Sequence, residues 1–169
     1  MRLTRTHREK LFKAVLDGDL QNLIHLLENV ETVNIQDSDL KTPLIHAVCH
    51  DVNDVRFQMV CFILRYKCNV NLRDKSGLTA LMYVCMEADR LDVVRLIAKH
   101  KKCNPNVQDN EGYTAAMHAV AASNAHALKI LVKPSSSSKH SIDLNITNNH
   151  GLTALSLAVR LQMSECCKI

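Results

Sequence analysis

Short runs of apolar residues alternate with longer amphipathic stretches along almost the whole chain. The run ALMYVC at 80–85 is apolar on most sides, which predicts a short helix enclosed by its neighbours. The segment 91–100 has a single apolar stripe with charges elsewhere, which predicts an outer helix. Its inward residues are expected to be Val93, Val94, Leu96 and Ile97. The pattern therefore predicts a series of helix pairs.

A polar segment recurs between these helix pairs with the same internal spacing. Its copies read VNIQDSDLKTPLIHAV from Val33, VNLRDKSGLTALMYVC from Val70, PNVQDNEGYTAAMHAV from Pro105 and LNITNNHGLTALSLAV from Leu144. In every copy an Asn precedes a Thr by eight residues, and successive Thr residues are 37, 35 and 39 positions apart. A period of this length is typical of stacked supersecondary units.

The first half of the recurring segment has the composition of a turn. Asn and Asp side chains bond nearby backbone groups, and Gly reaches positive φ without steric cost. Three copies place Gly two residues before the Thr, but the first copy has Leu40 there, so we expect a different backbone conformation at Leu40. The last copy has Asn148 where the others have Asp.

The Thr of each copy stands at the expected start of the inner helix. A Thr hydroxyl at this place accepts a hydrogen bond from an otherwise unpaired N–H of the first helical turn. Pro43, directly after the first of these threonines, suits the first helical position because no N–H is needed there. The predicted caps are Thr42, Thr79, Thr114 and Thr153.

The start of the chain fits the same unit without its polar segment, with helices at 11–15 and 20–28, a turn at 17–19 and a charged lead-in, RTHREK. We interpret the chain as one continuous array. Its expected parts are an N-terminal capping repeat at 1–33, repeats at 34–70, 71–105 and 106–144, and a partial fifth repeat at 145–169. The Ser-rich loop 134–141 is interpreted as a spacer, with phosphorylation as the alternative. We expect the native protein to continue past Ile169.

These segments resemble the ankyrin-repeat family, whose signature Asp-x-x-Gly-x-Thr-Pro-Leu-His-x-Ala is visible in DLKTPLIHA, DKSGLTALMYV, DNEGYTAAMHA and NNHGLTALSLA. The family's His three residues after Thr is absent, and His46 and His118 stand one position later. The resemblance implies an all-α solenoid with short β-hairpin fingers and a concave face that binds other proteins.

The composition is compatible with a closely packed helical array, with 47% hydrophobic residues, 4% aromatic residues and no Trp. No apolar run reaches the roughly 18 residues that a membrane span needs, and no signal peptide is recognisable. Seven cysteines without a CxxC pair favour reduced thiols over disulfides. We therefore expect a cytoplasmic protein, with the nucleus as an alternative.

The net charge of +4 is unevenly distributed, because residues 55–103 carry ten basic and four acidic groups. Such a region favours an acidic partner. Its basic cluster is interpreted as the solvated face of an outer helix; a contact with an acidic peptide, a lipid headgroup or nucleic acid is the alternative. Nucleic acid is the weakest of these because no aromatic residues are interleaved. The cluster consists of Arg90, Arg95, Lys99, Lys101 and Lys102.

Candidate catalytic and cofactor sites are weak. No phosphate-binding glycine loop and no nucleophile elbow is present, so we expect neither enzymatic activity nor a cofactor. His46, Cys49 and His50 have the i, i+3, i+4 spacing of metal ligands on a helix, but no fourth ligand is evident nearby. A metal- or redox-responsive module using these three residues is therefore one alternative function. A regulatory ankyrin segment of a larger enzyme or channel is another.

The resemblance also implies where a partner binds, since in this family partners contact the finger tips and the exposed side of the inner helices. The corresponding residues are Lys41, His46, Arg73, Lys75, Leu78, Tyr83, Gln108, Asn110, Glu111, Tyr113, His118, Asn149 and His150. Tyr83 and Tyr113 are the expected anchors, because rigid amphipathic rings carry much of the energy of interfaces. The expected function is protein–protein recognition by a monomeric scaffold or adaptor whose partner is another protein or peptide. Nucleic-acid binding and membrane insertion are not expected.

Overall fold

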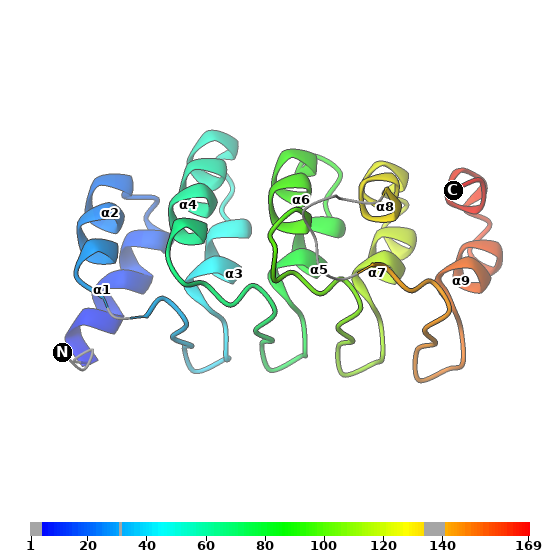
Figure 1. The fold of residues 1–169 in the computed structure, drawn as a ribbon, viewed down its shortest axis with the longest axis horizontal. Coiled ribbons are helices and arrows are strands. Elements are labelled where there is room, and N and C mark those ends of the chain that lie inside the picture. The colour runs from blue at the N-terminus through cyan, green and yellow to red at the C-terminus, as the bar shows by residue number, and fades with distance from the viewer. Residues whose placement is uncertain (1–4, 31, 134–140) are drawn as a thin grey trace.

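Five helix pairs stack side by side in chain order along the molecule (Figure 1). The computed structural model describes residues 5–30, 32–133 and 141–169. The inner helices of these residues are α1 (Arg5–Leu16), α3 (Pro43–Val48), α5 (Ala80–Cys85), α7 (Ala115–Ala121) and α9 (Ala154–Arg160). The outer helices are α2 (Leu20–Glu28), α4 (Asn53–Arg65), α6 (Leu91–Ala98), α8 (Ala125–Val132) and α10 (Ser164–Cys167). We number the pairs as the first to the fifth unit.

The core runs continuously through the stack, because inner helices contact the next inner helix and outer helices contact the next outer one. Each unit contributes residues that water does not reach, such as Leu23, Met59, Met82, Ile97 and Met117. No unit could bury this surface alone, so stacking is what makes the apolar faces stable in water. The all-α repeat architecture expected from the sequence is confirmed.

The predicted helix caps are confirmed. Thr42, Thr79, Thr114 and Thr153 precede α3, α5, α7 and α9, and each hydroxyl accepts a hydrogen bond from the N–H three residues later, as from Ile45 at 3.1 Å. Pro43 occupies the first turn of α3, as expected. These contacts are local, which is why the sequence alone predicts where the inner helices begin.

A finger precedes each inner helix from the second unit onward, and all four project from the same side of the stack (Figure 1). We define the fingers as residues 34–41, 71–78, 106–113 and 145–152. They turn as hairpins, as expected, although no described residue belongs to a β-strand. In the first finger the Asp37 N–H donates to the Lys41 carbonyl (3.0 Å), whereas the Lys41 N–H donates to the Asp37 carboxylate (2.9 Å). The Asp37 side chain thus accepts the Lys41 N–H, which in a β-ladder would bond the Asp37 carbonyl.

The expectation of a different backbone at Leu40 is wrong. Leu40 has φ 59°, in the same left-handed region as Gly77 (φ 83°) and Gly112 (φ 79°). Its N–H donates to the Asp37 carbonyl (3.1 Å), as the Gly77 N–H donates to that of Asp74 (2.9 Å). The turn geometry therefore prevails over the steric preference of leucine, at a cost of about 1–2 kcal/mol.

The first helix is longer than expected, and the last unit leaves apolar side chains exposed. Helix α1 begins at Arg5 rather than at Leu11, so the whole charged lead-in RTHREK belongs to the helix. In the fifth unit, Leu155 and Val159 of α9 are 59% and 62% exposed. The Ser-rich loop 134–141 lies almost entirely outside the described residues. No helix in the described part of the chain is both long and apolar enough to cross a membrane.

Candidate functional site

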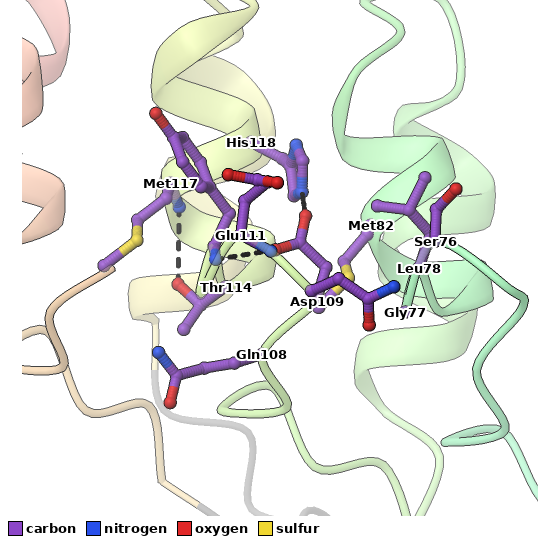
Figure 2. Close-up of polar contacts among 12 residues, drawn as sticks. Ser76, Gly77, Leu78, Met82, Gln108, Asp109, Glu111, Thr114, Met117 and His118 are labelled. Carbon is purple, nitrogen blue, oxygen red and sulfur yellow. Dashed lines mark hydrogen bonds and ion pairs between the residues drawn. The ribbon is translucent and has the colours of Figure 1, made fainter. Parts of the chain in front are cut away.

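In the second, third and fourth units, one Asp side chain joins the base of the finger to its inner helix. In the fourth unit, one Asp109 carboxylate oxygen accepts the N–H groups of Glu111 (3.0 Å) and Tyr113 (2.8 Å). The other oxygen lies 2.7 Å from Nε2 of His118 on α7 (Figure 2). Figure 2 also shows the neighbouring cap, in which the Met117 N–H donates to the Thr114 hydroxyl. We call the contact between finger and inner helix the finger-base contact.

The second and third units contain the same contact. Asp37 lies 2.7 Å from His46 Nε2, and the Tyr83 hydroxyl donates to Asp74 at 2.6 Å. Burial raises the pKa of Asp37, but hydrogen bonds from His46 and the finger backbone outweigh it, so that the pKa lies below its ordinary 3.8. Burial and the hydrogen bond to Asp74 raise the pKa of Tyr83 above its ordinary 10.0. Three residues named as candidate partner contacts therefore also hold the fingers in place.

The fifth unit departs from this arrangement. Asn148 replaces the Asp, and its side-chain oxygen still accepts the N–H groups of His150 and Leu152, both at 3.0 Å. Leu157 stands where the other units have His46, Tyr83 or His118, and its side chain cannot form a hydrogen bond. The Asn148 amide nitrogen is consequently buried without a hydrogen-bond partner. This unit lacks both the charge and the contact of the others.

Several candidate finger residues use their polar groups to bind the next finger. The Arg73 guanidinium donates to the Asn110 side chain (2.8 Å), and the Asn110 side-chain amide donates to the Lys75 carbonyl (2.7 Å). The Gln108 side chain donates to the carbonyl of Thr147 (2.9 Å). The Asn149 side-chain amide likewise donates to the carbonyl of Asn110 (3.0 Å). These side chains fix the spacing of the fingers.

Other candidate residues keep their functional groups accessible. Leu78 and Tyr113 are half-buried, and Glu111 and His150 are exposed. The half-buried Lys41 places its ammonium 5.4 Å from the centre of the Tyr83 ring, a cation–π contact between the second and third units. The finger side of the array therefore presents mixed apolar and charged groups.

A cavity with a volume of about 310 Å³ opens between the fourth and fifth units, where the fingers meet the inner helices. It brings together two predicted residues, Tyr113 and His150, from neighbouring fingers. The sequence analysis did not identify the cavity, although aligning the copies shows that Arg160 stands where the others have Cys49, Met86 and Ala121. The lining residues are Tyr113, His150, Leu152, Leu157, Arg160 and Leu161.

The structure does not assemble the candidate metal site. Helix α3 ends at Val48, so the expected helical spacing does not extend to His50. His46 contacts Asp37, whereas His50 Nδ1 accepts the Val52 N–H at 3.2 Å. Burial raises the pKa of the Cys49 thiol, which disfavours the thiolate that binds metals or reacts. No three metal-ligating residues converge anywhere in the described part of the chain.

The basic cluster is only partly a solvated helix face. Arg95, Lys99, Lys101 and Lys102 are exposed, as expected. Arg90 is not, because its side chain is 13% exposed and donates to the carbonyl of Val48 in the preceding unit at 3.0 Å. The interpretation of Arg90 as part of the solvated face is therefore wrong, since this side chain joins two units.

Stacked helix pairs with projecting fingers define this chain as a repeat solenoid. Comparison with known sequences identifies the repeat family. The family description "Ankyrin repeats (3 copies)" matches residues 11–109 and 98–169, so the chain belongs to the ankyrin-repeat family. It is 35% identical over 126 residues to human ankyrin repeat domain-containing protein 63, covering 75% of this chain and 32% of that protein. The mouse protein of the same name is equally similar, with 31% of its length covered. The chain thus spans about a third of the length of these relatives. Ankyrin repeats are in general protein–protein interaction modules.

Proposed function

We propose that this chain is a scaffold or adaptor module that binds a partner protein or peptide on its finger side. The observation that carries the proposal is the row of accessible groups, from Lys41 to His150, where the fingers meet the inner helices. A rigid row of this kind binds without a large loss of conformational entropy, because its backbone is already held in place.

The finger-to-finger hydrogen bonds support this proposal. They recur between neighbouring units, for example between the Lys75 N–H and the Asp39 carbonyl (2.9 Å) and between the Asn110 N–H and the Ser76 carbonyl (3.1 Å). A partner that spans several units therefore meets fingers with a defined separation. Specificity then comes from the side chains that the fingers leave accessible, of which Lys41, Leu78 and Tyr113 lie nearest the inner helices.

The proposal is tested with a double variant on the finger side, Lys41→Ala with Tyr113→Ala, which removes one cation and one ring. Partners are captured from a lysate of the cells that produce the protein, identified by mass spectrometry, purified and titrated calorimetrically. We expect the double variant to raise Kd at least about tenfold, since side chains of this kind contribute more than 1 kcal/mol at interface centres.

The matched control is Arg95→Ala with Lys99→Ala, which removes two exposed side chains on or beside α6, away from the fingers. It should leave Kd unchanged. Thermal unfolding of both double variants establishes that they are folded. A partner whose affinity falls with the α6 control and not with the finger-side variant would refute the proposed surface.

A further inference from the structure

The cavity lined by Tyr113 and Arg160, between the fourth and fifth units, combines apolar side chains with a cation. Its walls are the Tyr113 ring and three leucines, and its charged or titratable side chains are Arg160 and His150. No carboxylate lines it. An open cavity that combines apolar side chains with a cation matches a ligand that carries an apolar group next to an anion.

Two sequence changes in the fifth unit alter the charge in the same direction. At the finger base, the Asp109 carboxylate of the fourth unit is replaced by the neutral Asn148. At the end of the inner helix, Ala121 is replaced by Arg160. The fifth unit has therefore lost an anion and gained a cation compared with its neighbour.

The Arg160 guanidinium has no protein partner there. No ion pair or hydrogen bond joins it to a described residue, although it lies at the end of α9, where a cation could bond free carbonyls. Those carbonyls are already occupied, because Leu157, Ala158 and Val159 accept the N–H groups of the three residues that follow the helix. The donors of Arg160 are thus available to a ligand.

From this arrangement we infer that the cavity binds a peptide segment in which an Asp or Glu side chain lies beside a large apolar residue. The apolar side chain fills the space against Tyr113 and Leu157, and the carboxylate accepts hydrogen bonds from Arg160. This inference rests on the proposed function and specifies its partner: the segment that reaches the fifth unit is apolar and acidic.

The test uses two blocked dipeptides that differ only in charge, N-acetyl-Leu-Asp-amide and N-acetyl-Leu-Asn-amide, titrated into the ¹⁵N-labelled chain and followed by NMR. We expect the Asp peptide to shift the backbone resonances of Tyr113 and Leu157. The Asn peptide should bind about fivefold more weakly, the value of a partly exposed, geometrically favourable carboxylate–Arg pair. A third peptide, N-acetyl-leucine with its free carboxylate, tests whether the anion comes from a chain end instead.

Arg160→Gln should remove the difference between the Asp and Asn peptides, and the control Arg95→Gln on α6 should preserve it. Equal binding of the two peptides to the unaltered chain would overturn the inference, as would the absence of shifts at the cavity up to the solubility limit of the Asp peptide. Tighter binding of N-acetyl-leucine would also overturn it. The peptide titration does not depend on a natural partner, so the two proposals can fail separately. If a partner binds the central fingers but the peptides do not bind the cavity, the proposed function stands and only this inference is refuted.

Discussion

The finger-base contact of the third unit provides the sharpest test of how the fingers are held. Asp74 is 6% exposed, and one of its oxygens accepts the N–H groups of Ser76 and Leu78 (both 2.9 Å). The other accepts only the Tyr83 hydroxyl at 2.6 Å. Tyr83→Phe keeps the ring and removes this donor. The loss of one hydrogen bond to a buried charge should lower the free energy of unfolding by about 2 kcal/mol, and Tm by roughly 4–8 °C.

The measurement is urea unfolding followed by far-UV circular dichroism at neutral pH, where the midpoint should fall at an unchanged m value. Tyr113→Phe is the matched control, because the Tyr113 hydroxyl makes no hydrogen bond to the described residues, and its effect should stay within about 0.5 kcal/mol. Equal midpoints for the two variants would refute the assignment of a structural role to the Tyr83 hydroxyl.

The pH dependence gives a second, independent measurement on the same variant. Folding raises the pKa of Tyr83 above 10.0, so the protonated hydroxyl is the form that the fold favours. Its contribution is complete below about pH 10 and is lost as the pH rises further. The difference in stability between the unaltered chain and Tyr83→Phe should therefore narrow above pH 10. A difference that stays constant into the alkaline range would contradict the hydrogen bond to Asp74.

Two further changes probe the fingers. Asp37→Asn should destabilise the chain at neutral pH, and this difference should shrink as the pH falls below 3.8, because the folded pKa of Asp37 is lowered and its contribution is lost as the pH falls through the folded pKa. Urea unfolding at a series of pH values measures the difference, and a difference that does not shrink in acid would contradict the assignment. Leu40→Gly should stabilise the chain by about 0.5–1 kcal/mol, because the relief of the left-handed backbone strain at Leu40 exceeds the cost of the added entropy of the unfolded chain. A lower Tm for this variant would show that Leu40 is not strained.

The contact at Tyr83 also changes how binding experiments should be designed. The sequence suggested Tyr83 and Tyr113 as a pair of binding anchors. Tyr83→Ala would remove both a ring and the only partner that the Asp74 Oδ2 atom has among the described residues. For this reason the binding variants described above use Lys41 and Tyr113, whose side chains make no hydrogen bond to a carboxylate of the described residues, and leave Tyr83 in place.

The sequence alone was sufficient for the repeating unit, because its signals act over short distances. A capping Thr accepts a hydrogen bond from an N–H three residues away, and the finger turn closes within five residues. The conformations of Thr42 and Gly77 can therefore be predicted from their immediate sequence. Leu40 shows the limit of such rules. Its side chain disfavours the left-handed turn, yet the repeated pattern around it imposes the geometry of the other fingers.

Only the tertiary structure decided which surface residues are free. Arg73 and Gln108 look like exposed finger residues in the sequence, but each bonds a partner 37 or 39 positions away in the next unit. Arg160 looks like an ordinary helix-ending cation, yet stacking places it at the rim of a cavity with Tyr113, nearly fifty residues earlier in the chain. These relations depend on how one unit docks against the next, and that docking is set by packing between distant residues rather than by the spacing within a copy.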